Sequence, residues 1–205
     1  MKLYDGLGPN PHVVRIFIAE RGITGIETVP IDLRSGENRR EPFLSRNPTG
    51  TLPALETDDG RTIAEITTIC EYLDEVAPGA SLIGATAEER AETRMWTRRI
   101  DLRICEPMVG GFRNGPGLKI FQDRFPCYPD AAAALAAIAQ DGYAWLEKQM
   151  ADGRTFVVGE RLTLADILLY GFAAFGESVG QPVAEANTHI RAWFDRMKAR
   201  PAASA

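Results

Sequence analysis

The stretch NPTGTLPAL, residues 47–55, places a proline where a strand is expected to begin. Proline has no backbone N–H and cannot donate to a sheet ladder, so it is found at edges, bulges or turns. Twelve residues after Pro53, Glu65 precedes an apolar helical pattern at residues 66–76. A strand entered through a proline, followed by a helix headed by an acid, predicts a small α/β unit with an unusual sheet edge.

The sequence around this stretch alternates between strand and helix patterns up to residue 78. Strands are expected at 2–6, 26–33 and on both sides of the turn at 58–60, and helices at 12–21, 34–47 (short and irregular) and 66–78. Pro30 implies that the second strand lies at a sheet edge. This order is too short for two Rossmann halves and suits a four-stranded mixed sheet covered by helices.

After residue 85 the sequence favours helices alone. Helices are expected at 86–112, 129–153, 162–180 and 187–200. Thr86 with Glu89, and Thr163 with Asp166, have the three-residue spacing of a capping box. The change in pattern predicts an α/β domain at 1–78, a linker at 79–85 and an all-α domain at 86–205.

Composition and charge restrict the possible functions. Of 205 residues 45% are hydrophobic, and the net charge is 23 − 28 = −5 without a long basic run, so nothing indicates nucleic-acid binding. No signal peptide or membrane span is expected, which predicts a cytoplasmic protein without a membrane partner. Cys70, Cys105 and Cys127 are irregularly spaced and predict neither a disulfide framework nor a metal site.

The two halves together resemble the cytosolic glutathione S-transferase family, as a bacterial theta- or beta-like member. The resemblance rests on NPTGTLPALETDDGRTIAEITTICEYL (47–73) and GERLTLADILLYG (159–171). It implies a thioredoxin-like N-terminal domain, an all-helical C-terminal domain, glutathione as co-substrate without a metal, and a homodimer. The implied activity is attack of the glutathione thiolate on an electrophilic small molecule or a peroxide.

Two alternatives remain at this point. The chain could be a glutathione-binding or interaction module with weak catalysis. It could also be a specialised glutathione-dependent isomerase, dehalogenase or ether-cleaving enzyme, because the helical domain sets that choice.

The resemblance also implies a glutathione site. In the family, the position of Pro53 follows a cis peptide, and the backbone of Leu52 pairs with glutathione as with a short antiparallel strand. Glu65 and the following helix N-terminus hold the γ-glutamyl end. The family's serine is replaced by Ile66, with Thr67 one residue on.

The remaining glutathione contacts are implied at the glycyl end. The matching positions are Asn38 and Thr51, both neutral in this sequence. Arg39 and Arg40 are near enough in sequence to supply positive charge to the glycyl carboxylate.

The catalytic position of the family falls on Asn10. Family members have Tyr, Ser or Cys there, but residues 1–22 contain neither Ser nor Cys, and Tyr4 is expected inside the first strand. An Asn amide is a fixed double donor, so Asn10 could stabilise a thiolate without acting as a base. Alternatively Asn10 is only a cap or turn residue, and backbone N–H groups or His12 serve instead.

The wall of the electrophile site is implied to come from the first helix of the helical domain. The candidates are Trp96, Arg99, Ile100, Arg103 and Phe112. Arg99 and Arg103 lie one turn apart and would favour an anionic substrate. At helical spacing the same residues could instead form core or dimer contacts.

Overall fold

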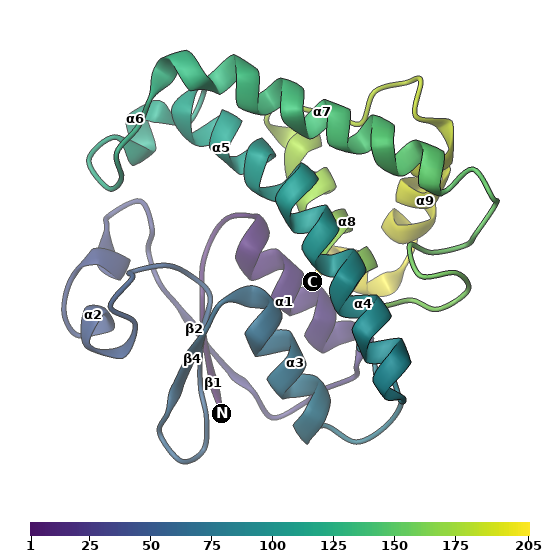
Figure 1. Ribbon diagram of the computed structural model, residues 1–205. Coiled ribbons are helices and arrows are strands. Elements are labelled where there is room, and N and C mark those ends of the chain that lie inside the picture. Colours follow the sequence, from purple (N-terminus) through teal and green to yellow (C-terminus); the bar gives the residue numbers. More distant parts are fainter.

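Four short strands form a mixed sheet in the computed structural model, which describes residues 1–205. The strands are β1 (Lys2–Asp5), β2 (Glu27–Pro30), β3 (Ala54–Glu56) and β4 (Thr62–Ala64), in the spatial order β2-β1-β3-β4. Figure 1 shows them in the lower part of the view, below the green helices of the second half. β1 is parallel to β2 and antiparallel to β3, and β3 is antiparallel to β4. The predicted four-stranded mixed sheet is confirmed, with Pro30 on an edge strand.

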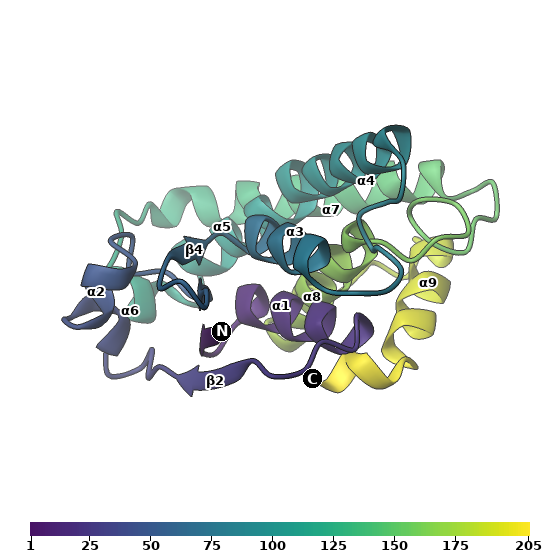
Figure 2. The ribbon, with the colours of Figure 1, turned by 90° about the horizontal axis from the view of Figure 1, so that it is seen from below.

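Helices cover both faces of this sheet. They are α1 (Pro9–Glu20), a 3₁₀ turn at Glu37–Arg39, α2 (Phe43–Arg46) and α3 (Ile66–Val76). Side chains alternate along a strand, so Leu3 faces the core under α1 and α3 while Tyr4 packs with Phe43 of α2 on the other face. Figure 2 shows α1 and α3 close to α8, with α2 far from them.

The second half is helical. Its elements are α4 (Ala87–Ile100), α5 (Glu106–Asn114), α6 (Leu118–Phe121), a 3₁₀ turn at Pro129–Ala131, α7 (Ala132–Gln149), α8 (Leu164–Ser178), α9 (Thr188–Lys198) and a 3₁₀ turn at Pro201–Ser204. The predicted helices are confirmed as elements. No helix is long and apolar enough to span a bilayer.

One prediction needs correction, because residues 86–112 do not form a single α-helix. A π-helical segment, Asp101–Cys105, separates α4 from α5. Pro107 stands in the first turn of α5. Its ring lacks an N–H and would clash with the carbonyl four residues earlier, so the regular ladder cannot continue through this point.

Both predicted capping boxes are present. The Thr86 hydroxyl accepts from the Glu89 N–H at 3.2 Å, and the Glu89 carboxylate accepts from the Thr86 N–H at 3.4 Å. The Asp166 carboxylate accepts from both the N–H and the hydroxyl of Thr163, at 3.0 and 3.1 Å. These bonds satisfy donors that a helix N-terminus otherwise leaves unpaired.

A single core of 35 buried side chains runs through both halves, from Leu3 to Ala202. α1 packs against α3 on one side and α8 on the other. Gly171 of α8 allows the closest approach, since a Cβ there would lie 2.5 Å from Val13 Cγ2. Residues 77–86 between the halves contain no helix or strand. The linker at 79–85 and the domain limits stay predictions.

Candidate active site

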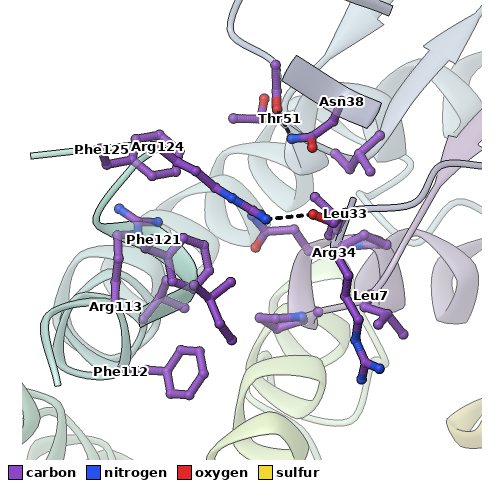
Figure 3. Close-up of a pocket in the computed structure, with 18 of the residues that line it drawn as sticks. Leu7, Leu33, Arg34, Asn38, Thr51, Phe112, Arg113, Phe121, Arg124 and Phe125 are labelled. Atoms are coloured by element: carbon purple, nitrogen blue, oxygen red, sulfur yellow. Dashed lines mark hydrogen bonds between the residues drawn. The ribbon is translucent and has the colours of Figure 1, made fainter. Parts of the chain in front are cut away.

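A cavity of about 530 Å³ opens between the sheet domain and the helices (Figure 3). This volume is within the range of small-molecule sites. From the first half it is lined by Leu7, Gly8, Pro9, Asn10, Pro11, Leu33, Arg34, Asn38, Arg39, Gly50, Thr51 and Leu52. From the second half it is lined by Val109, Phe112, Arg113, Ile120, Phe121, Arg124, Phe125, Phe175 and Ser178.

The chain enters β3 at this cavity with an unpaired backbone. The peptide bond between Leu52 and Pro53 is cis, as the resemblance implies. Neither the N–H nor the C=O of Leu52 makes a hydrogen bond within the chain, although the side chain is buried. Buried backbone groups are nearly always paired. Leu52 therefore offers one donor and one acceptor to an extended peptide in the cavity.

Glu65 stands beside this edge. Ala54 pairs with Ala64 in the β3–β4 ladder, so the residues next in line, Pro53 and Glu65, are neighbours. Glu65 precedes α3 with φ 70°, the one non-glycine residue with positive φ. Such a conformation costs about 1–3 kcal/mol and is concentrated at functional sites. The exposed carboxylate makes no hydrogen bond or ion pair within the chain.

Four predicted glutathione residues lie next to the cavity rather than on its wall. Pro53 and Glu65 flank Leu52 as described, and Ile66 and Thr67 form the half-buried first turn of α3. The first turn of a helix presents free N–H groups that suit a carboxylate. These N–H groups and the Glu65 carboxylate lie together at the N-terminus of α3, beyond the residues that line the cavity.

Asn38 and Thr51 face the cavity together (Figure 3). The Asn38 side chain is buried and donates from Nδ2 to the Gly50 carbonyl at 2.5 Å. Its amide oxygen has no partner in the chain. An unpaired buried acceptor costs about 1–3 kcal/mol, so Asn38 Oδ1 can bind an N–H of a ligand.

Two arginines connect the halves at the cavity. Arg39 donates to the carbonyls of Thr49 and Arg124 at 3.0 and 3.2 Å. Arg124 in turn donates to the Leu33 carbonyl at 2.7 Å, as Figure 3 shows. The predicted neighbour Arg40 is exposed, bonds to the Ser35 carbonyl, and does not line the cavity.

The electrostatic character of the cavity is positive. Arg34, Arg39, Arg113 and Arg124 line it, none forms an ion pair, and no Asp or Glu is among the lining residues. Low-dielectric walls with charges of one sign concentrate ligands of the opposite sign. The cavity suits an anionic ligand, although the whole chain carries a net charge of −5.

Asn10 lies in the first turn of α1 and lines the cavity. The N-cap is Gly8, with φ 117°, and the Asn10 side chain makes no capping bond or other hydrogen bond. Because Pro9 and Pro11 have no N–H, the Asn10 N–H is the one backbone donor of residues 9–11, and it is unpaired. Asn10 thus presents two unpaired donors, its side-chain amide and its backbone N–H, at the N-terminus of α1.

The two other candidates near the first strand point elsewhere. Tyr4 is buried and donates its hydroxyl to Glu56 at 2.7 Å. His12 contacts the Ala203 carbonyl at 3.2 Å, and burial lowers the pKa of its imidazole. Neither lines the cavity, whereas Asn10 does.

The predicted electrophile wall is corrected by the structure for four of its five residues. Phe112 lines the cavity, but Trp96 and Ile100 are buried in the core. Arg99 and Arg103 lie over the rings of Trp96 and Trp145, at 5.2 and 4.6 Å from the ring centroids. Both arginines are exposed and do not line the cavity, whereas the buried residues of α4 and the π segment pack on α7 and α8.

Sequence analysis missed most of the helical wall. Arg113, Phe121, Arg124, Phe125 and Phe175 line the cavity in addition to Phe112. The signal was the repeated pairing of phenylalanine with arginine in FRNGPGLKIFQDRF, residues 112–125. Aromatic and basic residues on a segment without clear helical periodicity indicate a surface that contacts a ligand.

The fold and the cavity define a class of protein in which a thioredoxin-like domain shares a ligand site with an all-helical domain. The family description "Glutathione S-transferase, N-terminal domain" matches residues 7–76, and "Glutathione S-transferase, C-terminal domain" matches residues 126–201. Glutathione S-transferase 2 of Saccharomyces cerevisiae is 32% identical over 208 residues, covering 98% of this chain and 87% of the yeast protein. The chain belongs to the glutathione S-transferase family.

Solved structures agree with this assignment. A glutathione S-transferase domain-containing protein of Marinobacter aquaeolei VT8 superposes with a TM-score of 0.90 at 37% identity, covering 99% of this chain and 100% of that one. The beta-etherase LigF of Sphingobium sp. strain SYK-6 superposes with a TM-score of 0.83 at 27% identity, covering 99% of this chain and 96% of LigF.

Proposed function

We propose that this protein is a glutathione transferase that activates the glutathione thiol and attacks an electrophilic small molecule. The observation that carries the proposal is the unpaired backbone of Leu52 beside the strained Glu65, on the same cavity as the free amide of Asn10. Family membership supplies the ligand, since the family uses glutathione.

Glutathione is an extended tripeptide with an ammonium group and two carboxylates. Its backbone pairs with the N–H and C=O of Leu52 as an added strand. The Glu65 carboxylate binds the ammonium group, and the N–H groups at the start of α3 bind the γ-glutamyl carboxylate. Ile66 supplies no hydroxyl, so Thr67 is the nearest side-chain donor. Arg39 supplies positive charge at the glycyl end.

The sulfur lies toward the N-terminus of α1 in this arrangement. A free thiol has a pKa of about 8.5, and lowering it by about two units needs about 2.7 kcal/mol. Hydrogen bonds to a charged group contribute about 1.5–3 kcal/mol each. The Asn10 amide and the Asn10 backbone N–H are two such donors, and the α1 dipole adds to them.

The reaction then needs no base from the protein. The thiol releases its proton to solvent, the thiolate attacks an electrophilic carbon to form a C–S bond, and the leaving group departs with the electron pair. The electrophile binds against the helical wall of the cavity. A homodimer is part of the proposal, because it is typical of the family.

Glutathione-dependent ether cleavage is the second candidate, and the likeness to the beta-etherase LigF favours it. The same thiolate attack applies, with an ether oxygen as leaving group. The two candidates share the glutathione site and differ in the ligand bound by the helical wall.

The experiment is a calorimetric titration of the purified protein with glutathione, followed by ultraviolet absorbance of the bound thiolate across pH. Binding with a bound-thiol pKa well below the free value supports the proposal, and turnover of electrophile and ether panels then separates the two candidates. Binding without a pKa shift would instead indicate a module that holds glutathione without activating it. Absence of binding would overturn the glutathione site itself.

A further inference from the structure

The wall of the cavity opposite Leu52 combines phenylalanine rings with arginines. The Phe112 ring lies edge-on to Phe175 and Phe121, with centroids 5.1 and 6.1 Å apart, and Phe121 lies 6.2 Å from Phe125. Aromatic rings in such an arrangement favour a flat apolar group that can stack or meet them edge to face.

Arg113 is fixed within this wall without a polar partner. Its guanidinium carbon lies 4.9 Å from the Phe125 ring centroid and 5.7 Å from that of Phe121. Its Nε is buried and donates to no group of the chain. An unsatisfied buried donor is costly, so this arginine is placed for an acceptor that the chain does not contain.

Arg124 also lines the cavity and has donors to spare. One Nη donates to the Leu33 carbonyl, and no carboxylate lies within ion-pair distance. Figure 3 shows Arg124 reaching across the cavity above Arg113 and Phe121. The deeply buried Arg21, by contrast, forms an ion pair with Asp74.

In the proposed function, glutathione does not account for Arg113. Its ammonium and γ-glutamyl carboxylate belong at Glu65 and the start of α3, and its glycyl end lies near Arg39, on the sheet side of the cavity. Arg113 comes from α5 on the helical side, among the rings that would receive the second substrate.

We propose that the second substrate is an anionic aromatic electrophile, whose flat ring packs on Phe112 and Phe121 and whose carboxylate binds Arg113 and Arg124. A planar guanidinium binds a carboxylate through two parallel hydrogen bonds and stacks on aromatic rings, which are the two features of this wall. The inference rests on the proposed function and specifies the substrate class for the same site.

The test uses two product analogues that differ only in charge. S-(4-carboxybenzyl)glutathione and its neutral amide, S-(4-carbamoylbenzyl)glutathione, are titrated into the protein by calorimetry, beside glutathione alone. We expect the carboxylate to bind about tenfold tighter than the amide or better, as a charge-assisted bond predicts.

Substitutions then test whether Arg113 causes the preference for the carboxylate. Arg113→Gln should abolish the preference for the carboxylate while glutathione keeps its affinity within about twofold. Arg113→Lys, which keeps the charge, should restore part of it. Lys119→Gln is the matched control, since Lys119 is an exposed cation on α6 that does not line the cavity. It removes the same charge and should leave the preference intact.

The outcomes separate the inference from the proposed function. Equal affinity of the wild-type protein for carboxylate and amide, with normal glutathione binding, overturns the inference alone. An Arg113→Gln variant that is folded by circular dichroism and weakens glutathione itself as much as both conjugates also overturns it, because Arg113 would then belong to the glutathione site. Failure of glutathione to bind the wild-type protein overturns the proposed function together with the inference.

Discussion

In the proposed function Asn10 is the side chain that meets the glutathione thiol, and its amide sets how the thiol can be activated. An amide donates hydrogen bonds but does not release a proton in the ordinary pH range. It can stabilise a thiolate that has already lost its proton to solvent. The rate should therefore follow ionisation of the bound thiol rather than the titration of a protein base.

Replacing Asn10 by alanine tests this role. Asn10→Ala removes one hydrogen bond to a charged sulfur, worth about 1.5–3 kcal/mol, and should lower kcat by about 10–100-fold with glutathione affinity changed less than about threefold. The bound-thiol pKa should rise by one to two units. Asn10→Asp places a negative charge beside the sulfur and should raise that pKa further. Unchanged turnover in Asn10→Ala would leave activation to backbone N–H groups.

A second prediction concerns Glu65. Alanine removes the carboxylate but keeps a side chain at φ 70°, whereas glycine removes the carboxylate and also relieves the strain. Glu65→Ala and Glu65→Gly should both weaken glutathione binding by about tenfold or more in calorimetry. In Glu65→Gly the φ of 70° no longer strains a side chain, so the free energy of unfolding should not fall below that of the wild type. Glu75→Ala, an exposed acid on the same helix, is the control. Wild-type affinity in all three variants would remove Glu65 from the site.

At the scale of elements, the features that depend on local sequence were predicted, whereas those that depend on tertiary packing were not. The strand-entering proline, the apolar periodicities and both capping boxes predicted the helices and the mixed sheet, because each is a local consequence of backbone chemistry. α6 has only four residues, too few to show a period or to be stable alone, so the sequence could not indicate it. The π-helical segment could not be predicted from the sequence, because it depends on how the folded chain accommodates Pro107.

The residues of the candidate site show the same contrast between local sequence and tertiary packing. Thr51 and Leu52, which directly precede Pro53, line the cavity, as does Asn38 earlier in the chain, and their contacts with glutathione stay a prediction. Arg99 and Arg103 were expected at the electrophile site because the resemblance implies a wall from the first helix of the helical domain. The position of a residue on a helix does not say what it packs against, and here both arginines are exposed and lie over the rings of Trp96 and Trp145.

Asp166 is the buried member of the second capping box and links three elements. Its carboxylate accepts from the Val157 N–H at 2.8 Å and Trp193 Nε1 at 3.0 Å, besides Thr163. Asp166→Ala leaves these donors unpaired in the core and should lower the free energy of unfolding by about 3 kcal/mol or more in urea titration at pH 5. Glu89→Ala, in the exposed box of α4, should cost only about 1 kcal/mol. Equal losses of unfolding free energy in the two variants would mean that burial of the second capping box contributes nothing to stability.

The same carboxyl predicts a pH dependence. Burial raises the pKa of Asp166 from 3.8 to about 6. A folded-state pKa above the unfolded value gives stability that is present at low pH and is lost as the pH rises through about 6. The difference in unfolding free energy between wild type and Asp166→Ala should therefore narrow by about 1 kcal/mol from pH 5 to pH 7. A difference that widened with pH would contradict the raised pKa.

At the scale of the whole molecule, the cavity exists only because the two halves are held together. Leu52 and Asn10 come from the first half and the rings and arginines of the opposite wall from the second. α1 belongs to both, since it carries the turn with Asn10 and packs between α3 and α8. A common core through α1 fixes the distance between Leu52 and Asn10 on one side of the cavity and the helical wall on the other.

A substitution in the core of α1 should therefore lower the stability of the second half as well as the first. Phe17 is fully buried in the common core, and all three tryptophans, Trp96, Trp145 and Trp193, lie in the second half. Phe17→Ala should lower the free energy of unfolding by about 3–5 kcal/mol and the thermal midpoint by about 10 °C. Since one core unfolds as one unit, the midpoint from tryptophan fluorescence should shift as much as the midpoint from far-ultraviolet circular dichroism. Ala19→Ser, at an exposed position of α1, should shift neither. A fluorescence midpoint that stays at the wild-type value while part of the dichroism transition moves would show that the halves unfold independently, and the cavity would then depend on docking of two separate units.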